Sequence, residues 1–424
     1  FPNTTAKAKT TSGAITSEDN EKFTKLPKFG ENHDLYLYTD KSGNKLSESQ
    51  LKSPDGNVVT INKELFETLG ADYNDPLWDT FLDQLTTEDA IKLVVMGGYS
   101  TAEAESVGKI WLRDNDGPMG LTRSNASITE TSKWTWFPMA GLIGNSWNKQ
   151  LAYDYGKTVA AEGAATGVHG WYAPGANIRR SPFGGRNNEY YSEDPVLSGY
   201  SAAYTVLGAL EGNMAPYIKH FALNETETLR GSLYTWATEQ NIRENYLRPF
   251  EIAVKKGKAN GIMSAFNRVG SVWAGANHGL LTNILRDEWG FEGFVMTDWY
   301  SISRVNGANK GKNVQGLLMW AGNDCEMPGG NVKNMLTALN TDKTLRLGDL
   351  QKSAVNMLNV IAKSAVFENM LDKLATSDDA VTAAEAKQAK AILTKNKAQK
   401  VLDDLGYESK EDAAVKAQIA AAEK

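Results

Sequence analysis

The chain of 424 residues is 41% hydrophobic and 23% charged, and its formal net charge at pH 7 is −6. This mildly acidic composition, without a dense basic run or an apolar run long enough to cross a bilayer, excludes a nucleic-acid-binding charge pattern and a membrane span. The single cysteine and the wide spacing of the four histidines argue against a disulfide within the chain and against a cysteine-rich or histidine-rich metal centre, so we expect no metal and no cofactor.

The N-terminal region, residues 1–75, carries turn signals at residues 41–44 and 53–57 and few apolar runs. We expect it to be a linker or a wrap-around arm. Thr86, followed by Glu88 and Asp89, predicts a helix start with an N-cap and acidic residues in the first turn.

From about residue 108 the chain alternates between strand-like and helical segments. Helical patterns occupy residues 239–256 and 279–288. The strand-like runs are residues 109–112, 170–173, 217–221, 261–266, 294–297 and 317–321. This alternation predicts an α/β fold with parallel strands, and over this length a TIM-like (β/α)8 barrel of about 250 residues is the expected solution. An open doubly wound sheet is the rival, but no G-x-G-x-x-G follows an early strand.

The C-terminal part is predicted to be helical. An apolar-periodic stretch covers residues 354–367, and Asp349 is a candidate cap for it. Residues 369–424 are rich in Ala, Lys, Asp and Glu, which indicates a helical tail without catalytic chemistry, with a partly disordered segment as the alternative. The predicted organisation is therefore an irregular arm at 1–75, a barrel at 76–368 and a helical tail at 369–424.

A carboxylate stands at the end of the strand-like run 293–297. Asp298 and then Trp299 follow this run directly. In a barrel, the carboxyl ends of the strands form the face where barrel enzymes do their chemistry. The alternative is an aspartate that caps the next helix, in competition with Ser301. Trp299 fits either a core position or the wall of a sugar site.

Other predicted strands end in polar groups in the same way. Asp116 precedes Gly117-Pro118, a tripeptide that is also an ordinary turn. The loop at residues 177–195 contains three arginines and three acidic residues, and it could hold a guanidinium towards hydroxyls or form a self-contained network of ion pairs. Lys219 and His220 end a further strand, where a buried, hydrogen-bonded histidine is the alternative reading of His220.

Taken together, these segments resemble glycoside hydrolase family 3, the family of β-glucosidases and β-xylosidases. The resemblance covers residues 108–368, in the family's order. Its motifs are DGP at 116–118, RSPFGGRNNEYYSEDP at 180–195, KHFALNETE at 219–227, MSAFN at 263–267, GFEGFVMTDW at 290–299 and AGND at 321–324. The fold implied is a TIM-like barrel.

The resemblance implies a set of site residues. Asp298 would be the catalytic nucleophile, and Trp299 would lie beneath or beside the sugar. Asp116, Arg186, Lys219 and His220 would hold the sugar hydroxyls, and Phe266 stands where relatives often have tyrosine. The mechanism would be retaining, with a second acid ~5–5.5 Å from the nucleophile. Lys219 and Arg186 are expected to keep Asp298 ionised.

The second acid is not evident in the sequence. In many members of the family it is a glutamate of an α/β sandwich domain, and this chain resembles the branch in which that domain precedes the barrel. We therefore expect a domain or chain absent here to supply the acid/base. Glu225 and Glu227 are the candidates within the chain, and neither is favoured. A histidine–aspartate pair, used by another branch, is not expected because no second histidine follows Ala222-Leu223-Asn224.

The sequence thus predicts a retaining exo-β-glycosidase, with a β-linked glucoside or xyloside as substrate and β-glucosidase as the favoured activity. The alternative is a non-catalytic sugar-binding barrel or subunit. A metal-dependent hydrolase lacks the ligands it would need. The sequence does not fix the compartment; an exported or cell-surface bacterial setting is the one we favour.

Overall fold

The computed structural model of the chain describes residues 82, 85–104, 109–123, 127–299, 315–342 and 345–362. The arm predicted at 1–75 and the tail predicted at 369–424 lie outside the described residues. No helix in the described part is long and apolar enough to cross a membrane.

Two parallel sheets form the centre of the fold. The first contains β2 (Leu112–Asp116), β3 (Gly170–Tyr172) and β4 (Ala215–Pro216), with β1 (Ser100–Thr101) antiparallel to β2. The second contains β5 (Ile218–Phe221), β7 (Gly261–Ser264) and β10 (Phe294–Thr297), in the order β10-β7-β5. A short third sheet joins β6 (Tyr234–Thr235), β8 (Arg268–Val269) and β9 (Val272–Trp273).

Backbone contacts connect the two parallel sheets into a ring. Gly175, after β3, bridges in parallel to Lys219 of β5, and Met296 of β10 bridges in parallel to Cys325. Next to Cys325, the N–H of Glu326 donates to the carbonyl of Val94 at 2.8 Å. The chain from Val94 then runs into β1, which pairs with β2. The described strands therefore close on themselves through this segment, and the architecture is α/β and TIM-barrel-like.

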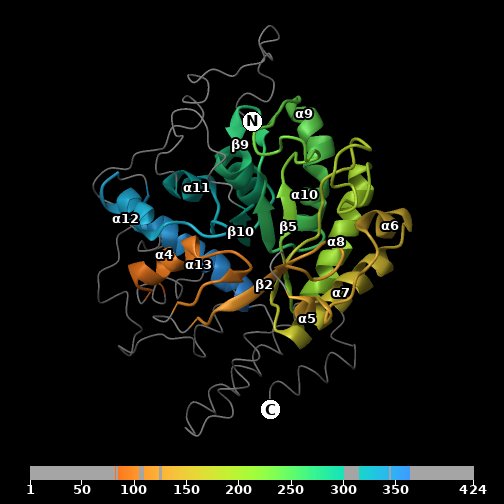
Figure 1. Cartoon of the computed structure of the whole chain (residues 1–424). Coiled ribbons are helices and arrows are strands. Elements are labelled where there is room, and N and C mark those ends of the chain that lie inside the picture. The colour runs from red at the N-terminus through yellow and green to blue at the C-terminus, as the bar shows by residue number, and fades with distance from the viewer. Residues whose placement is uncertain are drawn as a thin grey trace, which may run out of the picture.

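Helices surround the strands. In Figure 1 the strands lie in the middle, with α6, α7, α8 and α10 on one side and α4, α11, α12 and α13 on the other. The α-helices are α4 (Thr87–Val95), α5 (Ile128–Thr131), α6 (Ala140–Asn145), α7 (Lys149–Thr166), α8 (Pro195–Glu211), α9 (Glu239–Asn241), α10 (Arg248–Lys255), α11 (Gln315–Ala321), α12 (Val332–Asn340) and α13 (Leu347–Ala362). The others are the π-helices η2 (Ile242–Tyr246) and η4 (Gly279–Glu288) and the 3-10 turn η3 (Ala274–Ala276).

Sequence signals explain where several helices begin. The Thr86 hydroxyl accepts a hydrogen bond from the N–H of Asp89 at 3.2 Å, which confirms the predicted cap of α4. The carboxylate of Asp194 accepts from two N–H groups in the first turn of α8, where Pro195 occupies the first position. Asp349, predicted as a cap, lies in the first turn of α13 and accepts from the N–H of Arg346 at 3.0 Å.

Helices α7 and α8 approach each other very closely. A Cβ atom at Gly156 would lie 2.0 Å from the carbonyl oxygen of Thr205, and one at Gly208 would lie 2.0 Å from that of Tyr153. No side chain fits at these two positions, so the glycines allow the helix backbones to meet. This contact holds the two helices against the sheet as a pair.

The two largest clusters of the core lie on either side of the strands. Val295 of β10 belongs to the cluster under α7, α8 and α10, whereas its neighbours Phe294 and Met296 belong to the cluster under α4, α12 and α13. Successive side chains of a strand point to opposite faces, so β10 is buried on both. Such a strand holds the residue that follows it in a fixed position.

Two strand predictions need correction. The run 317–321 is not a strand but most of helix α11, and the strand position after β10 is taken by the bridge at Cys325. A short apolar run that is buried all round has no period that separates strand from helix, which explains the error. The run 109–112 is displaced: β2 begins at Leu112, and Lys109 makes only an antiparallel bridge to Ala104. The helices predicted at 239–256 and 279–288 are confirmed as helical segments.

Candidate active site

Asp298 lies directly after β10 and is 7% exposed. Its backbone N–H donates to the carbonyl of Ser264 at 3.0 Å, which extends the pairing of β10 with β7 by one residue. One carboxylate oxygen, Oδ1, accepts from the N–H of Trp299 at 2.6 Å. The other, Oδ2, is buried and has no hydrogen bond to any described residue. The carboxylate is thus fixed through one oxygen and leaves the other available.

A cavity of about 230 Å³ opens beside this carboxylate. Six of the seven side chains predicted from the sequence line this cavity: Asp116, Arg186, Lys219, His220, Asp298 and Trp299. The other lining residues are Tyr99, Tyr172, Arg230, Met263 and Met327. Residues from 99 to 327 therefore meet at the carboxyl ends of the strands, as a barrel predicts.

Phe266, the seventh candidate, is not among the residues that line the cavity. Its ring lies 4.4 Å from the guanidinium carbon of Arg230 and is 3% exposed. The structure therefore places Phe266 against Arg230, which does line the cavity. In this arrangement its contact with the site is a cation–π interaction with that guanidinium.

Alternating charges run along one side of the cavity, and we refer to this series as the charge chain. Its members, in order of contact, are Asp116, Lys219, Glu189, Arg186, Glu227, Arg230 and Asp298. Successive nitrogen–oxygen distances are 2.6, 3.6, 2.7, 3.4, 3.1 and 3.9 Å. The loop at 177–195 therefore does form a network of ion pairs, but the network extends beyond the loop and reaches the candidate nucleophile.

The strand end at His220 is fixed by Asn177. The Asn177 side chain accepts from the N–H of His220 at 2.6 Å and donates to its carbonyl at 3.1 Å. The His220 ring is 2% exposed, and its Nε2 lies 3.7 Å from Oδ2 of Asp298. Burial, together with the cations around it, lowers the pKa of His220 well below its ordinary value. The imidazole is therefore neutral and available for hydrogen bonding.

The electrostatics of Asp298 differ from the prediction in one respect. Burial raises the pKa of Asp298 to about 6, although Arg230, the N–H of Trp299, Arg186 and Lys219 all act in the opposite direction. The cations expected to keep the group ionised are present, but desolvation outweighs them. Above pH 6 the carboxylate is still mainly ionised.

Neither glutamate considered as an acid within the chain lines the cavity. Glu225 is buried, accepts from the amide of Asn177 at 3.2 Å, and burial raises its pKa to about 7. Glu227 is paired with Arg186 and Arg230. Among the described residues, Asp116 is the other carboxylate of the cavity, and Lys219 holds it at 2.6 Å.

Several lining residues were missed from the sequence. Arg230 was not predicted as a site residue, although a cation shortly after the motif at 219–227 could have been flagged. Tyr99 comes from the segment before β1, and its ring lies 4.7 Å from that of Trp299. Tyr172 and Met263 belong to strands β3 and β7, where position along the strand was the available signal. Nothing in the sequence marked Tyr99.

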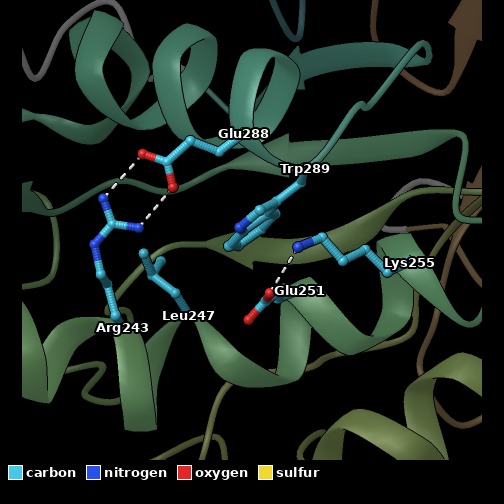
Figure 2. Close-up of a pocket in the computed structure, with 6 residues that line it drawn as sticks. All are labelled: Arg243, Leu247, Glu251, Lys255, Glu288 and Trp289. Atoms are coloured by element: carbon cyan, nitrogen blue, oxygen red, sulfur yellow. Dashed lines mark hydrogen bonds and ion pairs between the residues drawn. The ribbon is translucent and has the colours of Figure 1, made fainter.

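A second cavity, of about 170 Å³, lies between η2, α10 and the end of η4 (Figure 2). Its charged side chains pair with one another: Arg243 with Glu288 at 2.8 Å, and Lys255 with Glu251 at 2.8 Å. The described residues contain no group of His, Cys, Asp and Glu that could hold a metal. The cavity beside Asp298 is therefore the candidate site.

The sequence from residue 125 to 360 matches the family described as the glycosyl hydrolase family 3 N terminal domain. The chain belongs to this family. Among its relatives are a beta-glucosidase of Rhizobium radiobacter, 33% identical over 298 residues, and beta-glucosidase B of Emericella nidulans, 34% identical over 296 residues. Each match covers 69% of this chain but only 35% and 34% of the relative. The chain thus spans about a third of the length of the curated family members that it matches.

Solved structures of the family have the same fold. Beta-glucosidase 3B from Thermotoga neapolitana, in complex with α-D-glucose, is 35% identical with a TM-score of 0.59, and the match covers 75% of this chain and 47% of that one. The family 3 beta-glucosidase of Bifidobacterium adolescentis is 30% identical with a TM-score of 0.60, and the match covers 73% and 44%.

Proposed function

We propose that this chain carries the nucleophile of a retaining exo-β-glycosidase, most closely a β-glucosidase, and that its acid/base lies outside the described residues. The observation that carries the proposal is the buried Asp298 carboxylate, which presents an oxygen that accepts no hydrogen bond from the described residues to a cavity lined by hydrogen-bonding side chains. The relatives named as beta-glucosidases favour glucose as the sugar.

The mechanism has two displacements. In the first, Oδ2 of Asp298 bonds to the anomeric carbon while the bond from that carbon to the leaving oxygen breaks, and the acid/base protonates the leaving oxygen. In the second, the acid/base removes a proton from water, the water oxygen bonds to the anomeric carbon, and Asp298 is released as a carboxylate. Two inversions at the same carbon give net retention.

The other lining residues hold the sugar. Asp116 accepts hydrogen bonds from hydroxyls, Lys219 and Arg186 donate to them, and the neutral His220 contributes a ring nitrogen. Trp299 offers an indole surface to the sugar ring. Phe266 acts indirectly, because its ring packs against the guanidinium of Arg230.

The domain organisation is part of the proposal. Residues 76–368 would form the (β/α)8 barrel, with residues 1–75 as an arm and 369–424 as a helical tail. The family match at 125–360 and the ring of parallel strands support the barrel. The acid/base would come from a sandwich domain or a separate chain, with the sandwich placed before the barrel as in the branch that the sequence resembles.

An activated glycoside tests the nucleophile without needing the acid. The full chain is incubated with 2,4-dinitrophenyl 2-deoxy-2-fluoro-β-D-glucoside, whose leaving group departs without protonation, and the adduct is located by mass spectrometry. We expect one fluoroglucosyl group on the peptide that contains Asp298 and none in Asp298→Asn. Undiminished labelling of Asp298→Asn would overturn the assignment.

The second candidate is a sugar-binding barrel without catalysis. Among the described residues, the other carboxylate of the cavity is Asp116, and it is already paired with Lys219. This pairing favours the binding function, because it leaves no evident acid in the described part of the cavity. The same incubation separates the two functions. Binding of glucose in a calorimeter without any adduct at Asp298 would support the binding protein.

A further inference from the structure

Glu189 lies between two cations of the cavity without lining the cavity itself. Both of its oxygens accept from Arg186, Oε1 from Nε at 2.7 Å and Oε2 from a terminal nitrogen at 2.8 Å. Its Oε2 also lies 3.6 Å from Nζ of Lys219. The Glu189 side chain is 15% exposed, so these contacts are largely shielded from water.

This geometry fixes the direction of Arg186. A guanidinium held by two parallel hydrogen bonds cannot rotate out of the carboxylate plane without breaking one of them. The side of Arg186 that Glu189 does not occupy is left for Glu227, at 3.4 Å, and for the cavity. Lys219 is similarly placed between Glu189 and Asp116.

The charge of Glu189 is maintained at neutral pH. Burial alone would raise its pKa, but Lys219 and Arg186 together hold the pKa below its ordinary value. An anion between two buried cations also removes the repulsion that they would otherwise exert on each other. Glu227 is a weaker equivalent, since it makes one contact with each arginine and is 35% exposed.

We propose that Glu189 is a positioning residue that aims Arg186 at the sugar hydroxyls. The inference rests on the proposed function, because it assigns to that guanidinium the task of binding the sugar. It predicts that Glu189 acts through Arg186, so its removal should weaken sugar binding and have no further effect once Arg186 is gone.

The test compares Glu189→Gln, Glu189→Asp, Arg186→Ala and the double variant Arg186→Ala/Glu189→Gln with the unmodified chain. Glu193→Gln is the matched control: it removes the same charge four residues along the loop, from an exposed side chain outside the cavity lining. Each protein is titrated with glucose by calorimetry and with the dinitrophenyl fluoroglucoside for labelling rates. Urea unfolding at pH 7 shows that each variant is folded.

In Glu189→Gln we expect the glucose dissociation constant and the half-saturating fluoroglucoside concentration to rise about 10- to 100-fold, the usual range for losing charge-assisted hydrogen bonds. Glu189→Asp keeps the charge and should recover most of the affinity. The double variant should bind no more weakly than Arg186→Ala, because coupled residues are not additive. Glu193→Gln should match the unmodified chain.

Unchanged constants in Glu189→Gln, or losses that multiply in the double variant, would overturn the role of Glu189. If the unmodified chain binds glucose but forms no adduct, the nucleophile proposal fails while the glucose titrations still decide on Glu189. If adduct forms equally in the unmodified chain and in Glu189→Gln, with equal half-saturation, the positioning role fails and the nucleophile proposal stands.

Discussion

Replacing the buried Asp298 by asparagine should make the protein more stable at neutral pH while abolishing the adduct. The pKa of Asp298 is raised by burial from 3.8 to about 6. The folded protein therefore holds this proton more tightly than the unfolded chain, and the free energy of unfolding falls as pH rises between those two values. Above pH 6 the ionised group is a constant cost, which Asp298→Asn removes.

The size of the effect follows from the shift. A shift of about two units corresponds to about 3 kcal/mol, at about 1.4 kcal/mol per unit. At pH 7 nearly all of this applies. At pH 4, where the folded protein is protonated and the unfolded chain is about half protonated, the same expression leaves roughly 0.5 kcal/mol. Asp298→Asn should thus gain about 3 kcal/mol at pH 7 and little at pH 4.

Urea unfolding at pH 4 and pH 7 measures both differences. Asp342→Asn, on an exposed position after α12, is the matched control and should change the free energy of unfolding by less than about 0.5 kcal/mol at either pH. An equal gain at both pH values would show that the asparagine acts through packing. If the free energy of unfolding does not increase at pH 7, burial of the ionised carboxylate does not destabilise the protein, and the reasoning is wrong.

Three further substitutions address the site and the fold. Arg230→Gln removes a cation 3.9 Å from Asp298. At an effective dielectric constant of about 20, the attraction between the two charges is at most roughly 4 kcal/mol. Because the guanidinium is partly exposed, we expect a smaller effect: the pH midpoint of the labelling rate should rise by about one unit. Asp324→Asn breaks a buried ion pair with Arg286 at 2.8 Å and should lower the free energy of unfolding by about 3–5 kcal/mol in urea. Gly156→Ala forces α7 and α8 apart and should cost about 2–3 kcal/mol in the same measurement.

Two of these substitutions have a control. Arg230→Lys keeps the positive charge and should return the labelling midpoint most of the way; a midpoint that falls in Arg230→Gln would contradict the electrostatic account. Gly167→Ala adds a Cβ where nothing lies within 4 Å, at a φ of 73°, so its cost should be about 1 kcal/mol. If Gly156→Ala costs no more than Gly167→Ala, the helices are not in close contact. A small cost of Asp324→Asn would mean that water reaches Arg286.

Much of the barrel could be predicted from the sequence because its strands are short, apolar and flanked by turns. Strands β3, β5, β7 and β10 lie where the pattern placed them. The run 317–321 was misread since a helix buried on all sides shows no polar face. The antiparallel β1, which completes the ring, has two residues and no pattern to recognise.

The site was predicted where a side chain follows a strand directly, and missed where tertiary packing supplies it. Asp298, which follows β10, belongs to the first kind. Tyr99 belongs to the second, because its position depends on how the segment before β1 folds against Trp299. The pKa of Asp298 was also missed. The sequence indicated the cations near this carboxylate, but it did not show how deeply the carboxylate is buried, and burial is what raises the pKa.

In the charge chain every cation has an anion on each side: Lys219 between Asp116 and Glu189, and Arg186 between Glu189 and Glu227. Such a line is neutralised locally and projects little field into the solvent. Every cation of the charge chain already faces anions, so under the proposed function we expect the site to favour neutral glycosides over phosphorylated or sulfated sugars. For the same reason, changes in ionic strength should leave glucose affinity nearly constant, and selectivity should come from the directions of the hydrogen bonds.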